Sequence, residues 1–372
     1  MKVAIRVDAS KQIGTGHFVR CLALADALRQ QGNEIQFVCR HMQGNMTDMI
    51  FAHGHGFVIL QYAPDDRGTD NLHHSFWLGT SQSVDAHETL HVLSDKKYDW
   101  LIVDHYALDS KWELTLRPAA EMLFVIDDLA DRRHNCDLLL DQNYFAEMAT
   151  RYSGKVPETC QLLLGPKYAL LRDEFQQRHK HIVFRAGLVK RILVFFGGID
   201  AKNLTLLTIE SLVIINSMNI HVDVVIGRQH PSIVKIESLC FRYGFTCHVQ
   251  TDQMAELMAN ADLAIGAGGT AIWERCCMAL PSLVIALAQN QIVVSRELDR
   301  YGACIYLGSS DAVSQQEILH AIADILNNDD HLKKLSQKSY SLVDGKGVKR
   351  VCQELSKVQL RNLSLESTTN FL

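Results

Sequence analysis

The sequence predicts an α/β protein with two doubly wound domains, and three observations carry that prediction. Short β-branched stretches alternate with helical patterns along nearly all of the 372 residues, as in parallel sheets with right-handed helical crossovers. The alternation breaks once, over residues 171–190, which are rich in Gln, Arg, His and Lys. The chain is also longer than a typical single domain, and its 47% hydrophobic residues can fill two cores.

We therefore expect a Rossmann-like domain over residues 1–170, a linker over 171–190, a second Rossmann-like domain over 191–345, and a helical tail over 346–372. The two domains are expected to face a cleft. In the first domain the predicted strands are 2–8, 34–39, 57–60, 100–104, 123–126 and 136–140, the last at the sheet edge. The helices between them are 17–29, 46–53, 83–93 and 111–122, and residues 63–80 are expected to form a polar loop.

The second domain repeats this order of elements. Its predicted strands are 191–196, 221–226, 246–249, 263–265 and 282–286. Its predicted helices are 204–216, 253–260, 271–278 and 315–327, and the tail is expected to be helical over 348–360.

Charge and cysteine usage narrow the class of partner. A net charge of -5 argues against nucleic acid or an anionic membrane as the main partner, so a small ligand is expected. The ten cysteines form no CxxC pair, and no basic, apolar leader precedes the first strand, which indicates a reduced, cytoplasmic protein. No apolar run approaches the roughly 20 residues that a membrane span needs.

The first strand, glycine loop and helix hold the main candidate for catalysis. Gly14 and Gly16 allow close backbone approach, and His17 opens the helix at the end that should meet a ligand. A free imidazole has a pKa of roughly 6.5, which suits a general base. A tight turn whose histidine only solvates the helix end explains the spacing about as well.

A second glycine loop, Gly266 to Thr270, lies at the start of the helix 271–278. Its backbone and the Thr270 hydroxyl suit a phosphate group, and Glu274 lies one turn further on, where a carboxylate can bind a ribose. Alternatively, the loop Gly266 to Thr270 only connects the strand to the helix, and Glu274 is a solvated surface residue. Weaker candidates also follow predicted strands: Gly197-Gly198 with Asp200 and Asn203, the amide-rich turn 289–291, Tyr106, the pair Asp127-Asp128, and Arg132, Arg133 and His134.

The sequence gives no support for a metal site or a cofactor. His53 and His55 form an H-G-H pair, but no further ligand stands at metal spacing nearby. There is no Asp-x-Asp triplet, no P-loop lysine signature and no Gly-x-Ser-x-Gly elbow. We therefore expect no cofactor and metal-independent handling of a diphosphate.

Five motifs occur in order: GTGHFVRCLALA (14–25), VDHY (103–106), IDDLA (126–130), FGGID (196–200) and GAGGTAIWERCC (266–277). Together they resemble the UDP-2,4-diacetamido-2,4,6-trideoxy-β-L-altropyranose hydrolases of bacterial pseudaminic acid biosynthesis, which serve flagellin and surface-polysaccharide glycosylation. The resemblance runs from Lys2 to about Val351. It implies a GT-B-like fold and hydrolysis of this UDP-sugar to UDP and the free sugar.

The resemblance also implies roles for individual residues. His17 is the catalytic group that activates water for attack at the anomeric carbon, with C–O cleavage. The resemblance implies substrate contacts for Tyr106, Gly268, Gly269, Thr270, Glu274 and Asn290. Gly14, Gly16 and Gly198 are added as expected substrate contacts because they lie in strand-to-helix turns. Two alternatives remain at this point: a GT-B glycosyltransferase that uses a UDP-amino sugar, and a non-catalytic UDP-sugar sensor.

Overall fold

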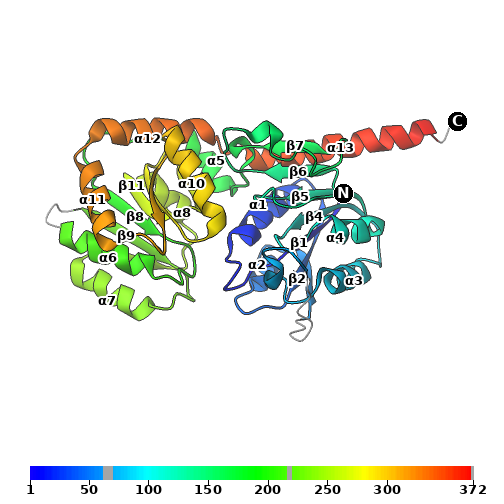
Figure 1. Ribbon diagram of the computed structural model, residues 1–372, viewed down its shortest axis with the longest axis horizontal. Coiled ribbons are helices and arrows are strands. Elements are labelled where there is room, and N and C mark those ends of the chain that lie inside the picture. The colour runs from blue at the N-terminus through cyan, green and yellow to red at the C-terminus, as the bar shows by residue number, and fades with distance from the viewer. Residues whose placement is uncertain (62–69, 216–219, 370–372) are drawn as a thin grey trace. The chain divides into compact units, whose positions relative to one another are not determined.

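The computed structural model describes residues 1–61, 70–215 and 220–369, and side chains as far as residue 360. The chain forms two compact units (Figure 1). Unit 1 comprises residues 1–143, 147–170 and 346–372, and unit 2 comprises residues 144–146 and 171–345. Among the described residues, no helix combines the length and apolar content needed to cross a lipid bilayer.

Unit 1 is built on a seven-stranded parallel sheet in the order β3-β2-β1-β4-β5-β6-β7. Its strands are β1 (Lys2–Val7), β2 (Glu34–Arg40), β3 (Gly56–Leu60), β4 (Tyr98–Asp104), β5 (Ala120–Ile126), β6 (Leu138–Asp141) and β7 (Gln161–Leu164). Its α-helices are α1 (Gly16–Gln30), α2 (Thr47–Ala52), α3 (Gln82–Val92), α4 (Ser110–Leu116) and α13 (Gly347–Thr369).

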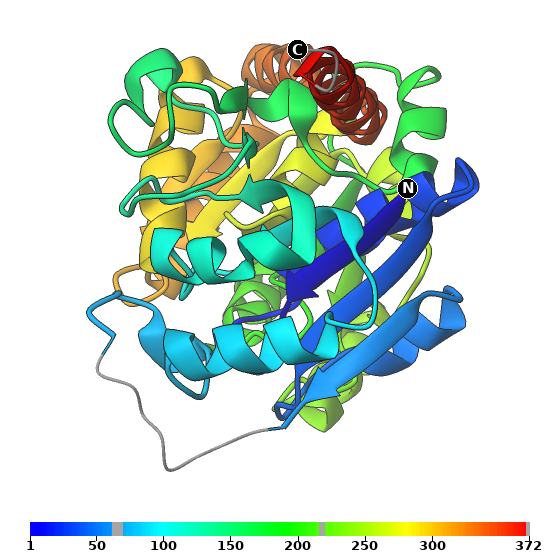
Figure 2. The same cartoon turned by 90° about the vertical axis from the view of Figure 1, so that its right-hand side faces the viewer.

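Alternating residues of β1 are buried in two hydrophobic cores, one on each face of this sheet. Val3 and Ile5 pack with α1, α2 and α13, whereas Ala4 packs with α3 and α4, which lie in front of the sheet in Figure 2. Both faces of an all-parallel sheet are normally covered in this way, which explains its near-continuous apolar strands. The expected tail, 346–372, belongs to this unit because Val351 and Leu355 are buried in the same core as α1.

Unit 2 has a six-stranded parallel sheet in the order β10-β9-β8-β11-β12-β13. Its strands are β8 (Arg191–Phe195), β9 (His221–Ile226), β10 (Thr246–Val249), β11 (Leu263–Ala267), β12 (Ser282–Ala286) and β13 (Ile305–Ser309). Its α-helices are α5 (Asp173–His179), α6 (Leu204–Ile215), α7 (Ile233–Tyr243), α8 (Met254–Asn260), α9 (Ala271–Cys277), α10 (Gln289–Tyr301), α11 (Gln315–Leu326) and α12 (Asp329–Leu342).

The predicted fold class of two Rossmann-like, doubly wound domains is confirmed, since both sheets are parallel with the same inner strand order. Two details of unit 1 differ from the prediction. The helix expected over 111–122 was wrong: α4 ends at Leu116, and β5 already begins at Ala120, because Pro118 cannot continue the helical hydrogen bonds. The strand near 136–140 is not the sheet edge, because β7 lies beyond it.

Residues 171–190, expected to form a linker, lie in unit 2 and contain α5. Phe175 and Arg185 of this stretch are buried, so it packs on its unit despite its polar composition. The expected loop 63–80 falls partly outside the described residues, and its remainder holds a short 3₁₀ helix, Ser75–Trp77. The amide-rich stretch 289–291 is the first turn of α10 rather than a turn between elements.

Candidate active site

Strand order defines the ligand end of each sheet. In unit 1 the chain runs outward from β1 to β3 and then returns to β4 on the other side of β1, and β8 and β11 are related in the same way in unit 2. In open parallel sheets, ligands bind outside the carboxyl ends of the strands at such a switch point. The loops after β1 and β4, and those after β8 and β11, are therefore the candidate ligand-binding segments of their units.

His17 and Asp104 meet at the switch point of unit 1, because β4 ends at Asp104 and α1 begins at Gly16. His17 Nδ1 lies 2.6 Å from Asp104 Oδ1, and 11% of the His17 side chain is exposed. An ionised carboxylate only accepts hydrogen bonds, so we assign the imidazole proton to Nδ1, which donates it to Asp104. Nε2 then carries the basic lone pair, and no described residue hydrogen-bonds to it.

Arg20, one turn further along α1, fixes Asp104 in this position. Its Nε and Nη2 each donate to one Asp104 oxygen at 2.7 Å, and its Nη1 lies 2.7 Å from Asp128 Oδ2. Burial alone raises the pKa of Asp104, but Arg20, and after it His17, hold that pKa well below its usual range. Asp104 is therefore an anion that can orient His17 and stabilise it when it takes up a proton.

Tyr106 lies against the imidazole. The two ring centroids are 4.5 Å apart at 87°, and the Tyr106 hydroxyl donates to Asp128 Oδ2 at 2.6 Å. Burial and the Asp128 carboxylate raise the pKa of Tyr106 well above its ordinary value, so the phenol stays a hydrogen-bond donor. Of the residues predicted from sequence, the structure brings His17 and Tyr106 together.

Two side chains that the sequence analysis did not single out, His74 and Trp77, complete the cluster. Trp77 stacks on Tyr106 with centroids 5.3 Å apart at 21°, and its ring lies 6.1 Å from that of His17. His74 contacts both Trp77 and Tyr106, and burial, then His73, lowers its pKa to about 4. The concentration of rings at residues 73–77 is the sequence signal that marks this segment.

The glycine loop before α1 is stabilised by its own backbone. Gly14 has a φ of 79° and donates its N–H to the Ser10 carbonyl at 2.8 Å, while the Ser10 hydroxyl accepts from the Gln12 and Ile13 amides. Gly14 is needed because side-chain-bearing residues rarely adopt this φ. Gly16 is instead the first residue of α1, so ligand contacts for these two glycines stay predictions.

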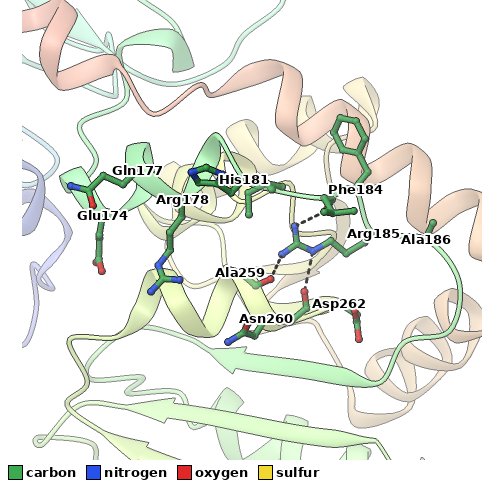
Figure 3. A pocket seen from close by; sticks show the side chains of 13 residues that line it. Glu174, Gln177, Arg178, His181, Phe184, Arg185, Ala186, Ala259, Asn260 and Asp262 are labelled. Atoms are coloured by element: carbon green, nitrogen blue, oxygen red, sulfur yellow. Dashed lines mark hydrogen bonds between the residues drawn. The ribbon is translucent and has the colours of Figure 1, made fainter.

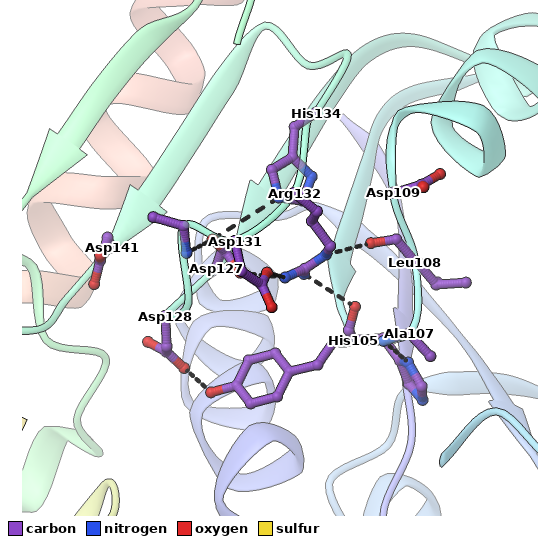
Figure 4. A network of polar contacts seen from close by, with 12 residues as sticks. His105, Ala107, Leu108, Asp109, Asp127, Asp128, Asp131, Arg132, His134 and Asp141 are labelled. Atoms are coloured by element: carbon purple, nitrogen blue, oxygen red, sulfur yellow. Dashed lines mark hydrogen bonds and ion pairs between the residues drawn. The ribbon is translucent and has the colours of Figure 1, made fainter. Parts of the chain in front are cut away.

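Only part of the polar group predicted at the ends of β5 and β6 reaches the His17 cluster. Arg132 pairs with Asp127 at 2.8 Å and donates to the Leu108 carbonyl at 2.7 Å (Figure 4). His134 Nδ1 lies 2.6 Å from Glu113 Oε1. These groups are buried and join the loops to one another, whereas the neighbouring Asp128 contacts Arg20 and Tyr106.

In unit 2, the short loop 268–270 connects β11 to α9 at the switch point. A Cβ atom at Gly268 would lie 2.4 Å from Ser295 Oγ, and one at Gly269 would lie 3.3 Å from Gln291 Nε2, so α10 leaves no room for a side chain at Gly268 and little at Gly269. The amides of Gly269, Thr270 and Ala271 hydrogen-bond to no described residue. Successive unpaired amides of this kind suit an anion.

Glu274 is not a solvated surface residue, which excludes one alternative considered from sequence. It is 9% exposed, its Oε1 lies 3.7 Å from Arg172 Nη2, and burial, opposed by Arg172, raises its pKa. Gly198 follows β8, and a Cβ there would meet nothing within 4 Å. Asn290 lies in the first turn of α10, beside Gln291, whose Nε2 a Cβ at Gly269 would meet at 3.3 Å.

Asp200 and Asn203, also predicted as candidates, serve the backbone. Asp200 accepts hydrogen bonds from the Leu204 and Thr205 amides and so begins α6, and Asn203 adopts a φ of 56° at the same helix start. These contacts explain both residue types by local folding.

A hollow of about 790 Å³ lies at the opposite, amino end of the unit 2 sheet (Figure 3). Arg178, Asn260 and Asp262 line it, and Asp262 directly precedes β11. Ligands of parallel sheets bind at the carboxyl ends, so we do not assign the active site there. Within the described ranges, no group of three or more His, Cys, Asp or Glu side chains is arranged to hold a metal ion.

These features define a GT-B-like protein whose first unit carries a histidine–aspartate pair and whose second unit carries a glycine loop with unpaired backbone amides. Residues 191–355 match the family model "Glycosyltransferase family 28 C-terminal domain". MurG of Acinetobacter baumannii is similar in structure, with a TM-score of 0.64 and 14% identity over 96% of this chain and 99% of that chain. At this identity the likeness shows the fold alone.

Particular relatives are similar in sequence. The UDP-2,4-diacetamido-2,4,6-trideoxy-β-L-altropyranose hydrolase of Campylobacter jejuni is 26% identical over 78% of this chain and 93% of its own length. The spore coat polysaccharide biosynthesis protein SpsG of Bacillus subtilis is 23% identical over 94% of this chain and 96% of its own length. The resemblance indicated by the five motifs is thereby confirmed.

Proposed function

We propose that this protein is a UDP-sugar hydrolase that releases UDP and a free 2,4-diacetamido-2,4,6-trideoxy sugar from UDP-2,4-diacetamido-2,4,6-trideoxy-β-L-altropyranose. The observation that carries the proposal is the His17 pair: Asp104 orients Nδ1, while Nε2 makes no hydrogen bond to a described residue. Such an imidazole is arranged to take a proton from a small molecule. The similarity to the C. jejuni hydrolase supports the choice of substrate.

In the proposed reaction, Nε2 of His17 takes a proton from water as its oxygen attacks the anomeric carbon. The new C–O bond forms while the bond from that carbon to the diphosphate oxygen breaks, and its electrons leave with UDP. Asp104 stabilises the imidazolium that results. General-base assistance contributes roughly 10²–10⁴-fold, and direct attack by water inverts the anomeric configuration.

We assign UDP to unit 2. The unpaired amides at Gly269 and Thr270 suit the diphosphate, and a buried Glu274 carboxylate suits the ribose hydroxyls. Gly268 and Asn290 complete the proposed contacts in that unit, together with Gly198, where the backbone is open on the Cβ side. In unit 1, Tyr106 contacts the sugar, and Gly14 and Gly16 set the position of His17.

The proposal includes a metal-independent reaction in the cytoplasm, with water as the acceptor and neither nucleic acid nor membrane as a partner. A direct test is UDP release by the purified protein from a panel of UDP-amino sugars, in EDTA and without any added acceptor. His17→Ala should lose nearly all turnover yet bind UDP with unchanged affinity. His87→Ala, which alters an exposed histidine of the same unit, should keep wild-type turnover.

Two results would refute the assignment. The first is a His17→Ala variant that hydrolyses at the wild-type rate. The second comes from a reaction in heavy-oxygen water: label in UDP rather than in the sugar would mean attack at phosphorus.

A second candidate is a glycosyltransferase that passes the sugar to another acceptor, and the family model that matches residues 191–355 favours it. The acceptor-free assay separates the two functions. A glycosyltransferase would release little UDP until an acceptor is supplied, whereas a hydrolase needs only water.

A further inference from the structure

Arg275 of α9 is a buried cation without an ion pair. Its side chain is among the largest fully buried ones, at 2% exposure. Its Nη2 donates to the Ala267 carbonyl at 2.6 Å, but its Nε and Nη1 have no hydrogen-bond partner within the part of the chain that the structure describes. No carboxylate of the described residues lies within ion-pair distance of it.

The other buried arginines of this chain use more of their donors. Arg40 leaves its Nε without a partner among the described residues, but it pairs with Asp85 and Glu88. Arg6 and Arg20 each pair with two carboxylates. Arg185 of unit 2 uses all three of its guanidinium nitrogens. They donate to the carbonyls of Val183, Met258, Ala259, Ala261 and Met278, and Figure 3 draws the bonds to those of these residues that line the hollow. Arg185 thus ties backbone segments together, whereas Arg275 keeps most of its donors unused.

The unused donors of Arg275 face the strand end that leads into the 268–270 loop. A Cβ at Gly266 would lie 3.1 Å from Arg275 Nη1, and Arg275 Nη2 binds the next carbonyl, that of Ala267. Ser295 Oγ, which a Cβ at Gly268 would meet at 2.4 Å, is also buried without a hydrogen-bond partner among the described residues. Unsatisfied buried polar groups therefore lie behind the same loop whose amides are unpaired.

We propose that Arg275 is a positioning residue that supplies fixed positive charge behind the 268–270 loop and so strengthens binding of a nucleoside diphosphate there. The inference rests on the proposed function, since it takes UDP as the ligand of this loop. A buried, unpaired guanidinium is costly to fold, and an anion bound at the loop neutralises it across a medium of low dielectric. Arg275 acts through its electric field, without touching the ligand.

The competing explanation is purely structural: the unused donors bind internal water and help α9 pack on the sheet. The two explanations predict opposite effects on the ligand-free protein. Removing an uncompensated buried charge leaves stability unchanged or raises it, whereas removing a structural hydrogen-bond centre lowers it.

The experiment compares wild type with Arg275→Met, Arg275→Lys and a control, Arg191→Met. Arg191 carries the same charge in the same unit but lies at the amino end of β8, paired with Asp223. Calorimetry gives the dissociation constants for UDP, UMP and uridine, and thermal unfolding gives the ligand-free Tm. We expect Arg275→Met to weaken UDP binding about tenfold or more, UMP binding less, and uridine binding less than twofold.

We further expect Arg275→Lys to recover part of the UDP affinity, Arg191→Met to bind UDP as wild type does, and the ligand-free Tm of Arg275→Met to be unchanged or raised. Equal loss for all three ligands, unchanged UDP affinity, or a strongly destabilised or unfolded Arg275→Met would overturn the inference. If the wild type itself binds no UDP, the proposed function fails together with this inference. If wild type binds UDP but the Arg275 variants do not show the expected changes, only this inference fails and the proposed function stands.

Discussion

Replacing Asp104 with Asn tests whether the His17–Asp104 pair defines the basic nitrogen. Asp104 Oδ1 accepts from both His17 Nδ1 and Arg20 Nη2, and Oδ2 accepts from Arg20 Nε and the Cys21 thiol. An Asn amide placed on either side brings an N–H donor against donors already present. In the milder case, one charge-assisted hydrogen bond to the carboxylate is lost. In the more severe case, the Asn amide donates to His17 Nδ1, and the imidazole proton moves to Nε2.

The size of the effect follows from these two limits. A hydrogen bond to a charged group contributes about 1.5–3 kcal/mol, which corresponds to roughly a 10–150-fold change in rate. Reversal of the tautomer in a comparable carboxylate–imidazole pair lowers turnover by about 10⁴-fold. We therefore expect kcat for UDP release to fall by about 10–10⁴-fold in Asp104→Asn, with UDP affinity within twofold of wild type.

Asp128→Asn is the matched control, because Asp128 also contacts Arg20 but not His17. It should lower kcat much less, and thermal unfolding of both variants checks that unit 1 stays folded. The reasoning is refuted if Asp104→Asn keeps kcat within threefold of wild type. Equal losses in both variants would instead mean that the position of Arg20, rather than the His17 tautomer, controls the rate.

Three further predictions concern other parts of the molecule. Trp77→Ala should raise KM for the acetamido-deoxy substrate at least tenfold more than Phe76→Ala does, because Trp77 flanks the His17 ring while Phe76 is 61% exposed. Equal changes in KM would mean that Trp77 does not contact the sugar. Gly268→Ala should cost about 1–3 kcal/mol of stability by overlap with Ser295 Oγ, and adding Ser295→Ala should restore most of it; a double variant as unstable as the single one contradicts this. Burial alone lowers the pKa of His134, but Glu113 and Asp127 raise it to about 9. The stabilisation from protonated His134 is complete below a pH of about 6.5 and is lost as the pH rises through about 9. Between about pH 7 and pH 9 the free energy of unfolding of wild type should therefore fall by about 2 kcal/mol more than that of His134→Gln. Denaturant titrations at the two pH values measure this difference.

Most of the fold was predictable because its signals are local. The strands 221–226, 246–249 and 282–286 agree with β9, β10 and β12 residue for residue, since apolar runs between turn residues mark buried parallel strands. Strands β7 and β13 and helix α7 were not predicted, although α7 carries an ordinary amphipathic pattern. The prediction also extended the helix after residue 111 through Pro118, where the proline rule already forbids it.

The site was predictable only in part. His17 follows a glycine loop, and residues 268–270 include two glycines. Both segments connect a predicted strand to a predicted helix, so the sequence pattern alone indicates them. Nothing local marks Arg275 as unpaired, because a residue's partners depend on which elements pack around it. The sequence also left open whether Glu274 is solvated, and only the packed structure shows that it is 9% exposed.

The sequence by itself determined the α/β class, the doubly wound order of elements and the position of His17 at a helix start, because hydrophobic periodicity and glycine placement act over a few residues. Only the tertiary structure decided that Asp104, 87 positions further on, orients that histidine, and that Arg20 and Asp128 hold it in turn. The reason is geometric: β1 and β4 become neighbours only when the parallel sheet assembles, and side-chain contacts across that junction have no counterpart in sequence spacing.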